Sequence, residues 1–387
     1  MKTLFKKEFS FSKKIIKVTK KLIKSKKLWK KLETITSSAY VQAKNKISHE
    51  LFIRLNLEVV INRYYDLKEN EAWYETWNNF RLLATDGSQI RLPDEKEIKE
   101  KYWTTKIKNA RWNQWEYCHW LLSVLYDPLN NLAIDTILER WYYSSFLFAV
   151  ILSYNKEVLF RIKTKTCKEA DELFEKDCKI DSKIITLKVE NKEKEYEEKY
   201  WIKLSRKLEK EIKIRLVKII LNTGEVEVLA TSLLDEEKYK TEIFSELYFK
   251  RWRIEVYYDI IKNRLWLENF TWKNIESVLQ DLYSSIYLSN FETILTRPYN
   301  KELELKTKQN NLRNKQKVNK QVSFNIIKNK IIELMLKWWS IDKQMKEMVK
   351  IFSMNISQER IWRTSSRKET TISKSLQFQR RKKKSCF

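Results

Sequence analysis

The stretch YFKRWRIEVYYDIIK, residues 248–262, determines the fold that we predict for this chain. Its pattern is helical, and at about 100° per residue four polar side chains fall within an arc of roughly 60° on one face: Tyr248, Arg251, Glu255 and Lys262. Such a face can hold a metal ion through its carboxylate and bind phosphate through its two cations. The alternative is an ordinary i,i+4 pair of Arg251 with Glu255 on a solvated surface.

The spacing of these four residues resembles the Y-R-E-K signature of DDE-type insertion-sequence transposases, family four. Three further segments carry the resemblance, which spans residues 37 to about 330: FRLLATDGSQIRLP (80–93), NRLWLENFTWKNIESVLQDLYSSIYLSNFE (263–292) and SSAYVQAKNKISHELFIRLN (37–56). The first is similar to the family's first catalytic strand, which ends in an aspartate, here Asp86. Taken alone, Asp86 before Gly87 is more typical of an aspartate that begins a turn.

The resemblance implies an α/β fold with an RNase H-like catalytic core, a β-rich insertion and an N-terminal helical DNA-binding region. It implies metal-dependent cleavage and strand transfer on DNA by two Mg²⁺ ions about 4 Å apart, for which Mn²⁺ may substitute. The implied metal ligands are Asp86, Glu139 and Glu255. Phosphate and DNA contacts fall to Tyr248, Arg251 and Lys262. The implied partners are the element's terminal inverted repeats, target DNA and a second copy of the chain.

The second carboxylate departs from the family pattern, an apolar strand ending in D-R-G-Y. This chain has ERWYYSS, so Glu139 is the positional match. Glutamate can bind Mg²⁺, but its extra methylene shifts the carboxylate by more than an active site usually tolerates. The short connection from Asp127 to Glu139 also lacks the helix and strand that family members have there, which indicates an internal deletion. Asp135 is the fallback ligand, and an inactive transposase remnant is an open alternative.

The charge balance indicates a nucleic-acid partner independently of the resemblance. Lys plus Arg number 78 against 51 for Asp plus Glu, which leaves a formal charge of +27. A basic surface of this size binds the phosphate backbone and releases counterions. Lysine is dense at the N-terminus, and the chain ends in RRKKKSCF, although such blocks are often solvated extensions. A nonenzymatic basic DNA-binding protein would have the same charge, and a nuclease of the same fold would cut DNA without joining it.

Glycine and tryptophan occur in unusual numbers. The chain has 2 Gly and 15 Trp, whereas average usage would give roughly 27 glycines. Several tryptophans stand where glycine is expected: Trp141, Trp266 and Trp272, with Trp112, Trp115 and Trp120 similar. Helices commonly end on a left-handed glycine, a conformation that costs Trp far more. Our hypothesis is that these codons are UGA read as glycine, whereas Trp252 is a genuine tryptophan. A protein truly rich in Trp is the alternative.

The pattern along the chain predicts helices over residues 11–65, then strands at 80–92, 121–126, 132–138, 158–163, 183–189, 212–221 and 225–230. A hairpin turn is predicted at 127–131, helix from 236 onward, a basic loop beyond Leu303 and a closing helix at 324–338. The predicted organisation is a basic helical region (1–72), the first part of the core (73–163), an insertion (164–233), the catalytic-glutamate helix with the end of the core (234–300) and a basic C-terminal region (301–387).

Several classes of protein are disfavoured. The longest apolar run, residues 141–154, is shorter than the ~20 residues that span a bilayer. No secretory leader pattern is present, so the cytoplasm is the expected location. The 4 cysteines and 2 histidines are scattered, which argues against a zinc site or disulfides, and Cys118 beside His119 would point to opposite faces of a strand.

Overall fold

The computed structural model describes residues 42, 44, 46–66, 74–102, 104–108, 114–137, 144–175, 181–190, 192–194, 197, 208–221, 224–270, 273–336 and 341–359. The chain divides into two compact units, each described separately below. Unit 1 comprises Met1–Arg140 with Arg253–Phe387, and unit 2 is Trp141–Trp252. Residues 1–41, predicted to form a basic helical region, lie outside the described residues.

Unit 1 is built on an antiparallel sheet centred on β3 (Gln114–Asp127). Strand β3 pairs with β1 (Ala84–Arg91), with β2 (Thr104–Lys108) and with β4 (Leu132–Ile137). Apolar residues recur at every second position of β3, which buries one face of a strand. The β3–β4 turn is the predicted one, because the Asp127 carboxylate accepts hydrogen bonds from the backbone amides of Leu129 and Asn130.

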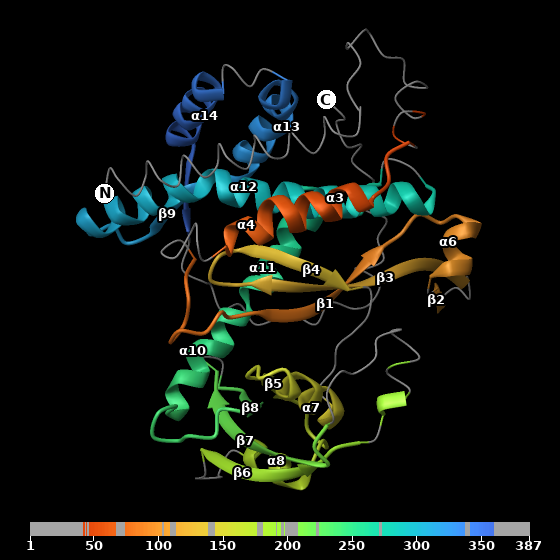
Figure 1. Ribbon diagram of the computed structural model, residues 1–387, viewed down its shortest axis with the longest axis vertical. Coiled ribbons are helices and arrows are strands. Elements are labelled where there is room, and N and C mark those ends of the chain that lie inside the picture. The colour runs from red at the N-terminus through yellow and green to blue at the C-terminus, as the bar shows by residue number, and fades with distance from the viewer. Residues whose placement is uncertain are drawn as a thin grey trace. The chain divides into compact units, whose positions relative to one another are not determined.

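Helices cover this sheet in Figure 1. The longest is α12 (Ile275–Gln309), which begins at Asn274, whose side chain accepts a hydrogen bond from the Ser277 amide. The N-terminal helices α3 (Glu50–Arg54), η1 (Leu55–Ile61) and α4 (Asn62–Tyr64) pack along α12. The catalytic-glutamate region forms α11 (Arg253–Asp259) and the π-helical turn η2 (Ile260–Arg264), and α6 (Lys96–Lys101) follows β1.

The C-terminal part of unit 1 differs from the prediction. The segment beyond Leu303, expected as a loop, continues as α12 to Gln309 and then forms strand β9 (Lys315–Val318). Strand β9 pairs with β10 (Ile356–Glu359), so a partner distant in sequence makes a strand of a polar stretch without its own periodicity. Helix α13 (Lys320–Leu336) is the predicted closing helix, and α14 (Ile341–Met354) was not predicted.

Unit 2 is a four-stranded antiparallel sheet in the order β5-β8-β7-β6. The strands are β5 (Leu159–Ile162), β6 (Ser182–Lys188), β7 (Glu211–Ile220) and β8 (Val226–Thr231), close to the predicted ranges. Helices α7 (Ser145–Ser153), α8 (Lys168–Phe174) and α10 (Thr241–Arg251) complete the unit. The unit therefore extends beyond the predicted insertion, 164–233, at both ends.

The backbone conformation at one tryptophan, Trp266, is relevant to the hypothesis that some tryptophans stand in place of glycine. Trp266 follows η2 with φ of 52°, the left-handed conformation that was expected at this helix end. The Leu267 amide closes the turn by donating to the Ile261 carbonyl oxygen at 3.0 Å. By contrast, Trp120 is 4% exposed, and its ring lies 4.8 Å from that of Tyr102. A tryptophan is well accommodated at residue 120 and strained at residue 266.

Trp112, Trp141 and Trp272 lie outside the described residues, as does the side chain of Trp115. Among the helices that the structure describes, none is long and apolar enough to cross a membrane.

Candidate active site

Asp86 is the third residue of β1, which continues to Arg91, so the strand does not end at this aspartate as the resemblance implied. The strand register fixes the face on which its side chain lies. Its cross-strand partner is Val124, and Ile90, four residues further on, faces Trp120. The side chains of directly opposed residues lie on the same face of a sheet. The side chains of every second residue along a strand also share one face. Val124, Ile90 and Trp120 are all buried in one apolar cluster. Asp86 therefore belongs to the covered face of the sheet.

Helix α11 covers that same face. Ile254, Tyr257, Tyr258 and Ile261 pack in the cluster that contains Val124 and Ile90. Glu255 borders this buried stripe and is half-buried, as is Asp86. The two predicted carboxylates thus come from different elements, a strand and a helix that is packed on it, and lie on one side of the sheet.

Tyr258 joins the helix to the strand. Its hydroxyl lies 2.6 Å from the backbone carbonyl oxygen of Asp86 and 3.0 Å from that of Leu122, and it accepts a hydrogen bond from the Val124 amide at 3.0 Å. The side chain is 5% exposed. Burial, followed by the charge of Asp86, raises the pKa of Tyr258 far above its ordinary value, so the hydroxyl keeps its proton. This residue fixes the backbone that carries Asp86.

Lys262 makes a second link, one helical turn further on. Its Nζ donates to the backbone carbonyl oxygen of Gln89 at 2.5 Å. Burial lowers the pKa of Lys262, and the negative charge of Glu268 partly opposes that shift. An ammonium group has three donors, so this bond leaves capacity for a phosphate oxygen. Since Tyr258 meets Asp86 and Lys262 meets Gln89, the helix and β1 run in the same direction.

The start of α11 is tied to the turn between β3 and β4. Arg253 donates from Nη1 to the Pro128 carbonyl oxygen at 2.7 Å. The turn itself is rigidly bonded, because the fully buried Asp127 accepts a hydrogen bond of 2.6 Å from the Tyr65 hydroxyl. Three side chains of one short helical segment, Arg253, Tyr258 and Lys262, therefore hold it to three points of the sheet.

Two residues of the signature lie in unit 2. Tyr248 is 4% exposed, and the guanidinium carbon of Arg251 lies 5.1 Å from the centre of its ring. The helix that carries them, α10, ends at Arg251, and α11 begins at Arg253. The single helix expected over residues 248–262 is therefore two α-helical segments and a π-helical turn. The roles of Tyr248 and Arg251 in binding DNA stay predictions.

The two candidates for the second carboxylate of the site are Glu139 and, as the fallback, Asp135. Glu139 lies outside the described residues. The fallback, Asp135, pairs with Leu125, which has the opposite orientation to Val124 in β3. Asp135 therefore lies on the other face of the sheet from Asp86, where it accepts a hydrogen bond from the Thr136 amide at 2.7 Å. Period-two alternation along β3 and β4 excludes it as a partner of Asp86 in one site.

Within the ranges that the structure describes, no group of three or more His, Cys, Asp or Glu residues is gathered as metal ligands would be. Asp86 and Glu255 lie on elements that share one face of the sheet, and the third predicted ligand lies outside those ranges. A carboxylate pair of this kind suits Mg²⁺, which is commonly bound by one or two carboxylates together with water and substrate phosphates.

Comparison with known proteins gives one family. Residues 134–291 match the transposase DDE domain. This match supports a DDE transposase. It covers β4, the whole of unit 2, the helix that carries Glu255 and the first half of α12, but not Asp86. No curated protein matches the chain.

Sequence analysis missed the residues that hold this site together. Tyr258 and Arg253 flank Glu255 in the stretch that was examined, yet neither belongs to the Y-R-E-K spacing. The available signal was the position of Tyr258 on the apolar side of the helix, three residues after Glu255, where a hydroxyl buried against a strand needs a partner.

Proposed function

We propose that this chain is a transposase of the DDE type, of insertion-sequence family four, that cleaves DNA at the ends of its element and transfers the cut strand to target DNA. The match of residues 134–291 supports the general class. The Y-R-E-K spacing of residues 248–262 supports the finer family. An RNase H-like core accords with a mixed sheet-and-helix unit in which the glutamate helix packs on the aspartate strand.

One observation carries the proposal. Tyr258 and Lys262 bond the helix of Glu255 to the backbone of the strand that carries Asp86. Carboxylates that share a metal site must be held by rigid elements, because an error of about 1 Å weakens such a site. A solvated helix with an accidental i,i+4 pair has no need of two side-chain hydrogen bonds to the strand of a second carboxylate.

The residues present fit a hard divalent cation. Asp86 and Glu255 would supply oxygen ligands to Mg²⁺ or Mn²⁺, with Glu139 as the third carboxylate. When bound, the ions would activate water or a DNA 3′-hydroxyl and stabilise the leaving oxygen. Lys262 would bind a phosphate oxygen with the donors that Gln89 does not use, and Arg251 and Tyr248 would contact the DNA backbone.

The partner is DNA, both the terminal inverted repeats of the element and the target. The formal charge of +27 supports this choice. Two element ends must be brought together, so a homodimer on DNA is part of the proposal.

A second candidate, an inactive remnant that still binds DNA, is favoured by one specific observation. Strand β3 ends at Asp127 and only the turn and β4 (Leu132–Ile137) precede Glu139, so the stretch between Asp127 and Glu139 is too short for the additional helix and strand of the family. An internal deletion here would have removed the original second aspartate. A nonenzymatic basic DNA-binding protein would behave identically in a binding assay.

The deciding experiment is Mg²⁺- or Mn²⁺-dependent nicking and joining of duplexes that carry the element's ends. The protein is tested with glycine restored at Trp141, Trp266 and Trp272, beside the matched variant Glu255→Gln. Cleavage by the first protein and loss of cleavage with retained binding in the second support the transposase. Binding without cleavage in both proteins supports the remnant, and joined products exclude a nuclease that only cuts.

A further inference from the structure

A basic hollow lies in unit 1 where α12 ends and β9 begins. It measures about 390 Å³, and its wall contains three cations, Lys308, Arg313 and Lys315, with one carboxylate, Glu304. The three cations are exposed. This stretch was expected to be a loop, and none of its residues belongs to the proposed catalytic site.

The hollow keeps a net positive charge after the negative charges beside its cations are subtracted. Glu304 removes one charge, and the carbonyl end of α12 adds about half a negative charge. About one and a half positive charges remain among the lining residues. Glu304 lies 3.6 Å from Lys308 and 3.7 Å from Lys315, so a single carboxylate is shared between two ammonium groups. The neighbouring Lys306, in contrast, has a pair of its own at 2.7 Å with Glu302.

The backbone around the hollow is held in a defined conformation. The helix ends through Asn311, which has φ of 47°, and the Leu312 amide donates to the Thr307 carbonyl oxygen at 3.0 Å. Strand β9 is paired with β10, with Lys315 opposite Glu359. A closed turn followed by a paired strand fixes the backbone that carries the three cations, which lowers the entropic cost of binding a ligand.

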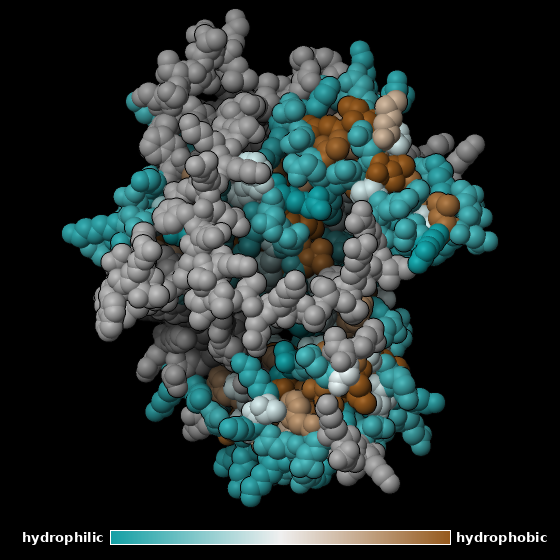
Figure 2. Space-filling model, turned by 180° about the vertical axis from the view of Figure 1, so that it is seen from behind, coloured by the Kyte–Doolittle hydropathy of each residue, from teal (hydrophilic) through white to brown (hydrophobic). Residues whose placement is uncertain are grey.

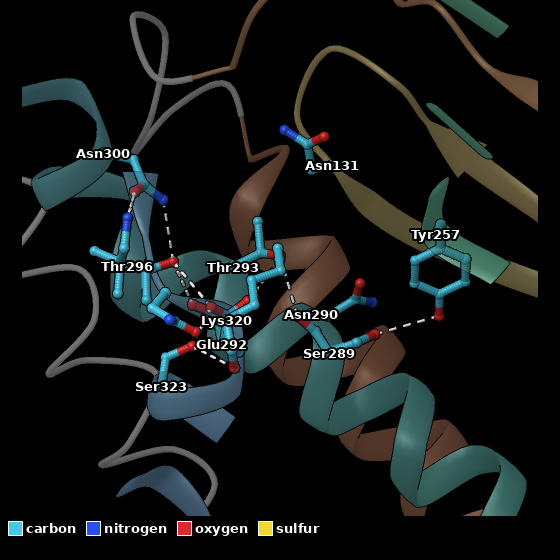
Figure 3. Close-up of polar contacts among 12 residues, drawn as sticks. Asn131, Tyr257, Ser289, Asn290, Glu292, Thr293, Thr296, Asn300, Lys320 and Ser323 are labelled. Carbon is cyan, nitrogen blue, oxygen red and sulfur yellow. Dashed lines mark hydrogen bonds and ion pairs between the residues drawn. The ribbon is translucent and has the colours of Figure 1, made fainter. Parts of the chain in front are cut away.

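Side chains of α12 and α13 hold the end of β9, and Figure 3 shows Asn300 of α12 and the contacts of Glu292 with Lys320 and Ser323. Asn300 accepts a hydrogen bond from the Val318 amide at 2.8 Å. The buried Glu292 carboxylate accepts from Ser323 at 2.6 Å and pairs with Lys320 at 2.8 Å. These contacts tie the C-terminal end of the segment that carries Arg313 and Lys315 to the long helix, and its other end continues directly from that helix.

We infer that this hollow is a contact site for the phosphate backbone of double-stranded DNA, separate from the catalytic carboxylates. Exposed cations on a fixed turn and strand contact phosphates without reading bases, and they set the position of a protein on a duplex. Figure 2 shows mainly hydrophilic residues, around smaller apolar patches, among the described residues of the face it presents. The inference rests on DNA being the substrate, as proposed above.

The test is the salt dependence of binding to a duplex of arbitrary sequence. The triple variant Lys308→Gln, Arg313→Gln, Lys315→Gln is compared with the native full-length chain. The slope of log K against log salt is negative, and each lost phosphate contact reduces its magnitude by about 0.9. We expect the magnitude of the slope to fall by about 2 to 3. We also expect binding to weaken on every duplex sequence.

A matched variant removes three charges from the opposite end of unit 1 in Figure 1, through Lys96→Gln, Lys99→Gln and Lys101→Gln on α6. We expect its slope to equal the native slope. Circular dichroism of both variants checks that they fold, and if the triple variant does not, the single substitution Arg313→Gln should still lower the slope by about 1.

Each outcome has a defined meaning. An unchanged slope in the folded triple variant, or an equal fall in the α6 variant, overturns the inference while nicking by the native chain keeps the proposed function. Preference of the native chain for single-stranded RNA of the same length, with loss of that preference in the triple variant, also overturns it. Absence of duplex binding by the native chain contradicts both proposals.

Discussion

The hydroxyl of Tyr258 lies 2.6 Å from the backbone carbonyl oxygen of Asp86. It bridges the helix of one predicted catalytic carboxylate and the strand of the other. The same oxygen accepts from the Val124 amide on the adjacent strand, so one side chain fixes two strands and a helix. This link gives the geometry of the candidate site its rigidity.

Replacing Tyr258 with Phe should lower the free energy of unfolding by about 1–3 kcal/mol, because the buried Val124 amide and two carbonyl oxygens lose a partner. The neighbouring Tyr257→Phe is the matched control. Tyr257 is equally buried, but its hydroxyl meets only the Ser289 hydroxyl, which also bonds the Ile286 carbonyl oxygen. We expect a cost near 0.5 kcal/mol there. Denaturant titration of both variants measures the difference, and equal losses would contradict the bridging role.

Replacing Trp266 with Gly should raise stability by about 1 kcal/mol, because a left-handed φ of 52° is strained for Trp and free for Gly. Trp252 supplies the control, since its φ of −59° is helical and Gly there should destabilise by roughly 0.5–1 kcal/mol. Thermal melts of the two variants test the prediction. A loss of stability in Trp266→Gly would argue that this tryptophan is native, and codons that are all UGG would end the UGA hypothesis.

Glu292 and Lys320 should show measurable coupling in a double-mutant cycle of Glu292→Gln with Lys320→Met. The carboxylate is 1% exposed and the lysine 33%, so the pair is only partly screened. We expect a coupling energy of about 1 kcal/mol. The exposed pair of Lys306 and Glu302 should give only about 0.3–0.5 kcal/mol. Coupling in the first pair no larger than in the second would mean that the Glu292–Lys320 pair does not help to hold α13 against α12.

Stability should fall steeply at alkaline pH. Burial is the main cause that raises the pKa values of five tyrosines, Tyr65, Tyr126, Tyr257, Tyr258 and Tyr299. A group whose pKa is higher in the folded state stabilises the fold below its unfolded pKa, and this contribution declines as pH rises above about 10. Tyrosinate absorbance should therefore appear together with loss of circular dichroism. Titration of all tyrosines near pH 10 in a protein that remains folded would contradict this.

Local patterns of sequence were sufficient for most of the strands. The apolar run at residues 121–126 and the Asp127 turn predicted the second half of β3, its hairpin and β4, because strand patterns and turn chemistry act over a few residues. Strand β9 could not be predicted this way. Its polar residues become a strand only through pairing with β10, about forty residues later in the chain.

For the candidate site, the sequence by itself determined which residues to consider: Asp86 at the end of an apolar run, and Glu255 with Lys262 at helical spacing. Only the tertiary structure decided that Asp86 lies on the face covered by the Glu255 helix, that Asp135 lies on the opposite face, and that Lys262 bonds the Gln89 carbonyl oxygen. The physical reason is that side-chain identity follows from the chain alone, whereas the face of a sheet and the partner of a buried hydroxyl depend on strand register and on the helix packed against it.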